Sequence, residues 1–199
     1  MEFLGNSEKE NLENGVLIFE RKPNLGEVAN EVFEEKEFSQ GDVVLIDNDE
    51  TLTPTWRNFL LKKPFTVLPE DSRLFLDTCE ERNIAKAIVT NMPRGGHYMN
   101  HKNPVFGYEH YFEKGILKNI EFPLTLCLGS LYKQTERSLY EIAAWTMCKV
   151  EEEKGRIAWI GNSYLDEGFG FRLERILREM DFKNKFFLYR LPWIRSFRN

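Results

Sequence analysis

The fold of this protein is decided by one stretch, Val43-Val44-Leu45-Ile46-Asp47-Asn48-Asp49-Glu50-Thr51-Leu52. Its four apolar residues form a continuous run between Gly41 and Asp47, which predicts a strand buried on both faces, as in a parallel sheet. Asp47 and Asp49 follow this strand two residues apart, so both carboxylates are expected to leave the sheet toward one site. The simpler interpretation of the pair, a solvated acidic turn, stays open.

The residues around this stretch alternate between predicted helices and predicted strands. Helical spacing of apolar residues predicts helices over 25–33, from Pro69 onward, over 139–150 and over 169–180. Short apolar runs predict further strands at 84–89, 124–128, 157–160 and 186–189. This alternation predicts an α/β fold, a Rossmann-like parallel sheet with helices on both faces.

Two of the predicted helices carry more detailed expectations. Asn24 and Glu27 are placed for a capping box at the start of the first helix. The helix that Pro69 begins is expected to use four inward-facing residues, namely Leu74, Phe75, Thr78 and Cys79.

The chain of 199 residues is expected to form one domain over 15–199, preceded by a flexible N-terminal arm at 1–14. With 27 basic against 32 acidic residues its net charge is −5, which argues against a general nucleic-acid binder. Cys79, Cys127 and Cys148 are expected to be reduced core thiols. No apolar run approaches the ~18 residues of a transmembrane segment, and the acidic start lacks the features of a secretory signal, so a cytoplasmic location is expected.

Four motifs in register at the predicted strand ends resemble those of the haloacid dehalogenase (HAD) superfamily, most of whose members are phosphatases. The first is Val43–Leu52, and the second is the apolar run that closes in Thr90-Asn91. Lys133 follows the third predicted strand and precedes a helix, where the family places its phosphate-binding lysine. The stretch 160–167, Ile-Gly-Asn-Ser-Tyr-Leu-Asp-Glu, resembles the acidic fourth motif.

The resemblance implies a Mg²⁺-dependent phosphomonoesterase with a HAD-like hydrolase domain that acts through an aspartyl-phosphate. Asp47 would be the nucleophile, and Asp49 the general acid and base, a residue that the dehalogenases lack. Phosphate oxygens would be held by Thr90, Asn91 and Lys133. Taken singly, Thr90 also fits a strand-end hydroxyl and Lys133 a surface amine. The implied Mg²⁺ ligands are Asp47, Asp49, Asn162, Asp166 and Glu167.

The fourth motif departs from the family pattern. Asn162 stands where the first acid is expected, and Asp166 and Glu167 compete for the second. An amide oxygen can bind Mg²⁺ but brings no charge, so weaker binding is expected. A catalytically weak or inactive HAD-fold binding or scaffold protein is therefore the alternative function.

The length of the loops bears on the substrate. About 17 residues separate Thr51 from the helix at Pro69, too few for a folded cap, so a minimal cap or none is expected. An open site suits a bulky or macromolecular phosphate ester, such as a lipid headgroup, a nucleic-acid end or a phosphoprotein. A small phosphate ester stays open as the substrate, as does closure of the site by a second subunit in a homo-oligomer. The fourth motif aligns without gaps on the capless branch that includes the YqeG-like phosphatidylglycerophosphate phosphatases, which puts Glu167 on the second acid. Thr90-Asn91 is also common in polynucleotide 3′-phosphatases and histidinol phosphatases.

Overall fold

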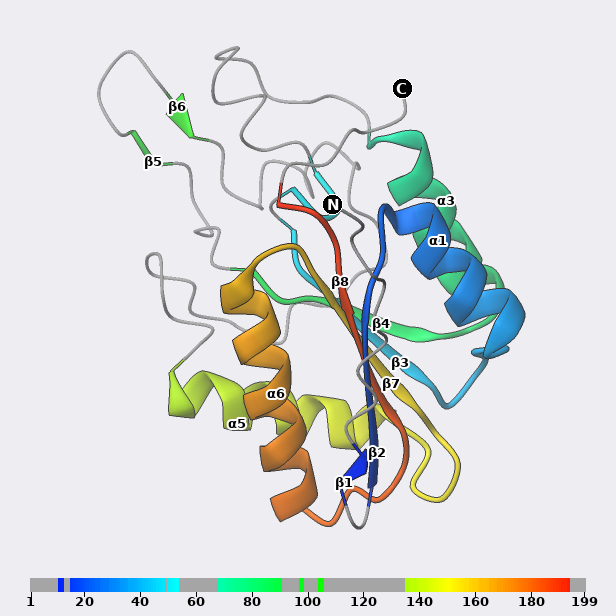
Figure 1. Ribbon diagram of the computed structural model, residues 1–199, viewed down its shortest axis with the longest axis vertical. Coiled ribbons are helices and arrows are strands. Elements are labelled where there is room, and N and C mark those ends of the chain that lie inside the picture. The colour runs from blue at the N-terminus through cyan, green and yellow to red at the C-terminus, as the bar shows by residue number, and fades with distance from the viewer. Residues whose placement is uncertain are drawn as a thin grey trace, which may run out of the picture.

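The computed structural model describes residues 11–12, 15–48, 50–53, 68–90, 97–98, 104–105 and 135–193. Within them, a parallel sheet has the strand order β2-β8-β7-β3-β4 (Figure 1). These strands are β2 (Gly15–Arg21), β8 (Phe186–Arg190), β7 (Ile157–Gly161), β3 (Val43–Ile46) and β4 (Ala85–Ile88). The short β1 (Asn11–Leu12) pairs antiparallel with β2. The predicted α/β fold is confirmed at this level.

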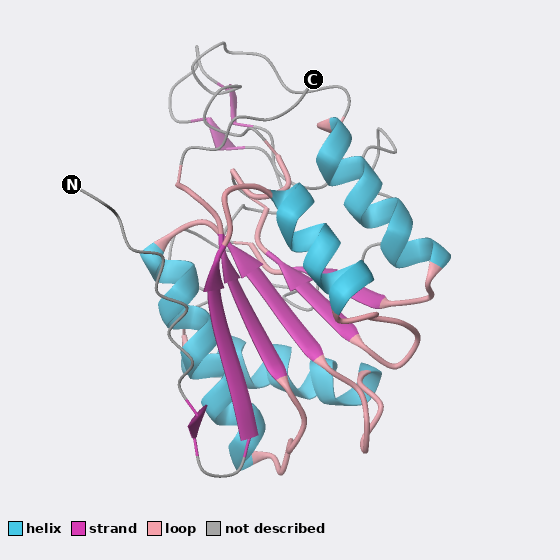
Figure 2. Cartoon of the chain, turned by 45° about the vertical axis from the view of Figure 1, so that its right-hand side comes forward, coloured by secondary structure: helices cyan, strands magenta, loops and turns pink. Residues whose placement is uncertain are grey.

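Helices cover both faces of the sheet, as Figures 1 and 2 show. One face carries α1 (Leu25–Ala29), η1 (Asn30–Glu35) and α3 (Glu70–Glu81). The other carries α5 (Glu136–Lys149) and α6 (Tyr164–Glu179). A separate hydrophobic cluster lies on each face. None of the helices in the described part of the chain is long and apolar enough to cross a membrane.

The central strand β3 shows why the apolar run forms a fully buried strand. Val44 and Ile46 belong to the cluster under α1 and α3, whereas Val43 and Leu45 belong to the cluster under α5 and α6. Successive side chains of a strand point to opposite faces, so a strand between two helical layers must be apolar at every position.

The first helix begins at the predicted residue, with only the Asn24 half of the predicted capping box among the described contacts, and then widens. The Asn24 side chain accepts a hydrogen bond from the Glu27 N–H at 3.0 Å, which caps α1. Beyond Ala29 the helix continues as the π-helix η1, in which the N–H of Lys36 reaches the carbonyl of Glu31, five residues back, at 2.8 Å.

The π-helix carries a buried carboxylate, Glu31, which is 2% exposed. It contacts the Lys22 ammonium, lies 3.7 Å from Lys36 Nζ, and accepts a hydrogen bond of 3.2 Å from the Tyr189 hydroxyl of β8. Burial raises the pKa of Glu31, but the hydrogen bonds and charge of Lys22 outweigh burial and leave the pKa below its usual value. This network joins the N-terminal segment to the sheet.

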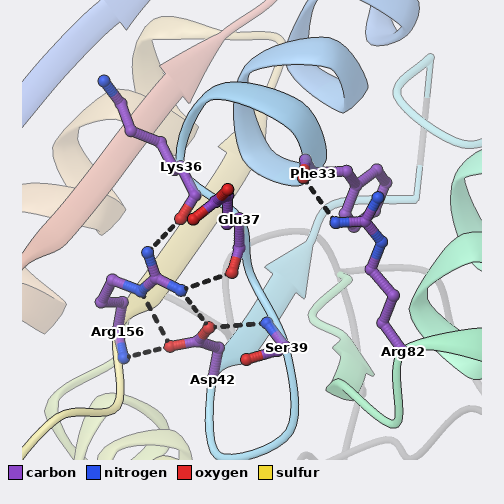
Figure 3. Close-up of polar contacts among 7 residues, drawn as sticks. All are labelled: Phe33, Lys36, Glu37, Ser39, Asp42, Arg82 and Arg156. Carbon is purple, nitrogen blue, oxygen red and sulfur yellow. Dashed lines mark hydrogen bonds and ion pairs between the residues drawn. The ribbon is translucent and has the colours of Figure 1, made fainter.

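Arg156 ties the end of this helix to the amino end of the sheet (Figure 3). Its guanidinium donates to both carboxylate oxygens of Asp42, at 3.1 and 2.6 Å, and to the carbonyls of Lys36 and Glu37. Glu37 has a positive φ of 51°, so the chain turns sharply there. The guanidinium also lies 4.6 Å from the centroid of the Phe38 ring. Arg156 thus contacts the three residues that follow the helix, Lys36, Glu37 and Phe38. It also binds Asp42, the residue before β3.

Several sequence-based expectations were wrong in detail. No strand was expected at 15–21, where β2 lies, although Val16-Leu17-Ile18-Phe19 is a short apolar run. The inner face of α3 carries Ser72, Phe75, Leu76 and Cys79, so Leu74 (51% exposed) and Thr78 do not belong to it. Cys79 is buried as predicted, but Cys148 lies on the exposed side of α5.

Other expectations lie outside the described residues. These are the strand at 124–128, the core position of Cys127 and residues 1–10 of the N-terminal arm. Asn11 and Leu12 of that arm form β1. Two further short strands, β5 (His97–Tyr98) and β6 (Pro104–Val105), pair antiparallel with each other beyond the carboxyl ends of the parallel strands (Figure 2).

Candidate active site at the carboxyl edge of the sheet

Asp47 occupies the carboxyl end of the central strand. Its N–H donates to the carbonyl of Ile160 on β7 at 2.8 Å, so the residue is held by the sheet although it follows the last residue of β3. Its side chain lies among buried residues, with the whole residue 4% exposed. The Thr51 hydroxyl donates to Asp47 Oδ2 at 3.4 Å. A buried carboxylate therefore stands at the middle of this edge.

The residues after Asp47 form a tight turn around one carbonyl. The Asn48 carbonyl accepts hydrogen bonds from the N–H groups of Thr51, Leu52 and Thr53, at 3.3, 3.0 and 3.0 Å. Glu50 has a positive φ of 58°, and its N–H returns to the carbonyl of Thr53 at 2.8 Å. The hydroxyl of Thr51 connects this turn to the Asp47 carboxylate. Asp49, the predicted general acid, lies outside the described residues.

Thr90 lies beside Asp47 at the end of the neighbouring strand. Ile46 pairs with Ile88, and the N–H of Val89 donates to the Ile46 carbonyl at 2.9 Å. Thr90 follows directly and is fully buried. Because adjacent strands lie about 4.8 Å apart, the register brings Thr90 to the same part of the edge as Asp47. Asn91 and Lys133, the other predicted phosphate ligands, lie outside the described residues.

Asn162 lies on the other flank of Asp47, one residue beyond the end of β7. Ile46 pairs with Ile160 on this side, and Asn162 is 4% exposed. Its Nδ2 donates to the carbonyl of Trp193 at 3.3 Å. The segment after β8 makes a second contact here, because the N–H of Leu191 donates to the carbonyl of Gly161, the residue before Asn162, at 2.8 Å.

Asp166 holds the loop that carries Asn162. Its Oδ2 accepts hydrogen bonds from the Ser163 hydroxyl at 2.6 Å and from the N–H groups of Ser163 and Asn162 at 3.0 and 3.2 Å. The Asp166 N–H donates to Ser163 Oγ at 3.1 Å, which completes a capping box at the start of α6. The loop packs so closely that a Cβ added to Gly161 would lie 2.4 Å from Asp166 Cβ.

Glu167, the other candidate for the second acid, forms an ion pair with Arg190 at the end of β8. Glu167 Oε2 and Arg190 Nη1 are 2.7 Å apart. The same guanidinium lies 3.6 Å from the centroid of the Tyr164 ring. Its hydrogen bond and charge lower the pKa of the Tyr164 phenol.

Arg190 was not predicted as part of the site. The signal that could have found it is its register, because Arg190 pairs with Gly161 and so ends its strand beside Asn162. It places a guanidinium next to the predicted motif, on β8, which β7 separates from the strand that Asp47 follows.

The structure thus gathers Asp47, Thr90 and Asn162 at the carboxyl ends of three adjacent strands, β3, β4 and β7. Asp166 and Glu167 lie in the first turn of α6 and are bonded to the loop and to Arg190. Within the described ranges, no three or more His, Cys, Asp or Glu side chains are grouped so as to hold a metal ion. Asp47, Thr90 and Asn162 bring one acid, one hydroxyl and one amide to the edge.

Apolar side chains are exposed beside this edge. Tyr164 is 73% exposed, Leu165 56% and Trp193 67%. Tyr164 and Leu165 begin α6, two and three residues after Asn162, and the Trp193 carbonyl bonds to Asn162. The edge is therefore bordered by apolar surface as well as by charge.

Comparisons of the chain with protein-family models, with curated proteins and with solved structures found no match in any of the three.

Proposed function

We propose that this protein is a Mg²⁺-dependent phosphomonoesterase of the HAD superfamily that acts through an aspartyl-phosphate. The observation that carries the proposal is the buried carboxylate of Asp47 at the carboxyl end of the central strand, between Thr90 and Asn162. In open parallel sheets, ligands bind beyond the carboxyl ends of the strands, which is where these three residues lie.

In this proposal, Asp47 attacks the phosphorus atom of the substrate and displaces the alcohol, which leaves a phosphoryl group on its carboxylate oxygen. Thr90, at the end of the next strand, orients a phosphate oxygen with its hydroxyl. The resemblance of the sequence motifs assigns the proton transfers to Asp49 and further phosphate contacts to Asn91 and Lys133.

The residues at the edge fit Mg²⁺ because their donor atoms are oxygens, which this hard cation prefers. Asp47 and Asn162 would hold it, together with Asp49 from the motif. When bound, the ion would offset the negative charge of the nucleophile and of the phosphate. Asp166 is better placed to shape the loop than to bind the ion, because its Oδ2 already accepts three hydrogen bonds.

The exposed apolar residues favour a substrate that is larger than its phosphate group. Tyr164, Leu165 and Trp193 offer a surface for the rest of the molecule, and Arg190 adds a cation beside them. A phosphate ester with an apolar or aromatic portion, such as a lipid headgroup ester or a nucleic-acid end, matches this surface.

A second function, a HAD-fold binding or scaffold protein with weak or no turnover, is favoured by a separate observation. Residue 162 is neutral, Asp166 is bonded to its own loop, and Glu167 is paired with Arg190. All three positions of the fourth motif are therefore without charge or already bonded.

The test is hydrolysis of p-nitrophenyl phosphate with and without MgCl₂, by the wild-type chain and by Asp47→Asn. We expect Mg²⁺-dependent turnover that falls at least 10³-fold in Asp47→Asn, because an amide keeps the shape of the side chain but is not a nucleophile. Asp77→Asn is the matched control, since Asp77 is an exposed residue of α3 whose ion pair among the described residues is with Arg73, at 3.4 Å. Trapping of the phosphoryl group on Asp47, read by mass spectrometry, identifies the intermediate.

Two results decide between the functions. If Asp47→Asn retains the turnover of the wild type, Asp47 is not the nucleophile. No turnover on a panel of phosphorylated lipids, sugars and nucleic-acid ends, with folded protein and saturating Mg²⁺, would leave the scaffold function as the better account.

A further inference from the structure

The segment that follows β8 reaches back to the candidate site by way of its backbone. The N–H of Leu191 donates to Gly161, and the carbonyl of Trp193 accepts from Asn162 Nδ2 at 3.3 Å. Trp193 is 67% exposed, and its backbone carbonyl rather than its indole accepts the hydrogen bond.

The contact determines which way the Asn162 amide faces. A carbonyl is only an acceptor, so it requires the amide nitrogen and leaves the Oδ1 oxygen on the opposite side of the planar group. The strand order β8-β7-β3 places the segment after β8 on one flank of β7 and Asp47 on the other. Nδ2 therefore faces the β8 flank, and Oδ1 takes no part in the contact with Trp193. No hydrogen bond to this oxygen comes from the part of the chain that the structure describes.

The surroundings also disfavour a carboxylate at this position. An aspartate would set an oxygen against the Trp193 carbonyl, with no hydrogen atom between the two acceptors. The Asp166 carboxylate is close as well, since its Oδ2 lies 3.2 Å from the backbone nitrogen of Asn162. A neutral side chain that donates to the Trp193 carbonyl and adds no charge beside Asp166 suits both neighbours, and asparagine does so.

We propose that Trp193 is a positioning residue of the candidate site. Its backbone carbonyl turns the Asn162 amide so that Oδ1 faces Asp47 and serves as a neutral ligand for Mg²⁺. The metal part of this inference rests on the proposed function, whereas the orientation of the amide does not. The departure of residue 162 from the acidic pattern is then an adaptation to the C-terminal segment.

The experiment compares the wild-type 199-residue chain with Asn162→Ala and Asn162→Asp by thermal unfolding at pH 7.5 without metal. Asn162→Ala should lower Tm by about 2–4 °C, the loss of one hydrogen bond in a chain of this length. Asn162→Asp should lower Tm by about twice as much, because it adds repulsion between acceptors to the same loss. A Tm for Asn162→Asp equal to or above that of Asn162→Ala would overturn the proposed orientation.

The role of Oδ1 is tested separately with MgCl₂ alone, by isothermal titration calorimetry. Asn162→Ala should bind Mg²⁺ at least tenfold more weakly than wild type, because it lacks the oxygen. Equal Mg²⁺ affinities of the two proteins would overturn the ligand role of Asn162.

A spectroscopic measurement excludes a merely structural contact. On addition of MgCl₂ to isotope-labelled protein, the Cγ resonance of Asn162 should shift, while the exchange rate of the Nδ2 proton that is bonded to Trp193 should not change. A Cγ resonance that does not respond to Mg²⁺ would refute ligation. Failure of the phosphatase assay would be a distinct result, because Tm order and Mg²⁺ binding do not depend on turnover.

Discussion

Replacing Arg156 by methionine should destabilise the fold by about 2–3 kcal/mol. The side chain donates to both oxygens of Asp42 and to the carbonyls of Lys36 and Glu37 (Figure 3). Methionine keeps an apolar chain of similar length against Phe38 but removes every one of these donors. The variant therefore tests the polar contacts and leaves most of the packing in place.

The magnitude follows from the burial of the acid. The side chain of Asp42 is 5% exposed and that of Arg156 25% exposed. Removing one partner of a buried ion pair usually costs about 3–5 kcal/mol, because the other charge stays buried without compensation. Asp42 retains two donors in the variant, the N–H groups of Ser39 and of residue 156 at 2.8 and 2.7 Å. The carbonyls of Lys36 and Glu37 are near solvent, so water can replace the guanidinium there. These features put the loss at or just below the lower end of that range.

The assay is equilibrium unfolding in guanidinium chloride, with thermal unfolding as a second measurement. A loss of 2–3 kcal/mol corresponds to a fall in Tm of about 4–12 °C for a chain of this size. Arg175→Met is the matched control, because Arg175 is 71% exposed on α6 and lies 3.8 Å from Glu179. The control should change stability by less than about 0.5 kcal/mol.

A double-mutant cycle isolates the pair. With Asp42→Asn already present, Arg156→Met should cost at least about 1.5 kcal/mol less than in the wild-type background. If Arg156→Met matches the Arg175→Met control, or if the two changes at 42 and 156 are additive, the ion pair does not hold the end of the helix to the sheet.

Three further outcomes follow from described residues. Gly161→Ala should destabilise the protein by about 1–3 kcal/mol, because the added Cβ would overlap buried atoms of Asp166. Gly168→Ala should stabilise α6 by about 0.5–1 kcal/mol, because nothing lies within 4 Å of the added Cβ. Urea unfolding of both variants checks the contrast. The lowered pKa of Glu31 contributes stability that is present above its usual value of 4.5 and is lost as the pH falls through the folded pKa. Glu31→Gln should therefore be less stable than the wild type at pH 7 and should lose less stability than the wild type on acidification, as read by urea unfolding at both pH values. Burial raises the pKa of Cys79 to about 12, so iodoacetamide at pH 8 should label the exposed Cys148 in folded protein and Cys79 only after unfolding, as read by peptide mass spectrometry.

Features with a local signal were predictable from the sequence. The apolar run at 43–46 can be satisfied only between two apolar layers, and it forms the central strand. The cap of the first helix was predictable because Asn24 and the N–H of Glu27, which donates to it, are only three residues apart in the sequence. The strands at 85–88, 157–161 and 186–190 and the helices between them follow from periodicity in the same way. The parallel arrangement of the sheet follows from their alternation.

The partners of the polar side chains were decided by tertiary structure. Arg156 and Asp42 are 114 residues apart in the chain, Asn162 and Trp193 are 31 apart, and Glu167 and Arg190 are 23 apart. Composition and spacing carry no signal for such pairs, because a charged or amide side chain on a loop has many possible partners before the strands are in register. The motifs in the sequence identified Asp47, Thr90 and Asn162 as candidates. The strand order of the folded sheet brings the three residues to adjacent strand ends. The motif itself offered both Asp166 and Glu167 as the second acid, and only the resemblance to the capless branch favoured Glu167. The fold bonds Asp166 to the start of its own helix and Glu167 to the end of a strand, β8.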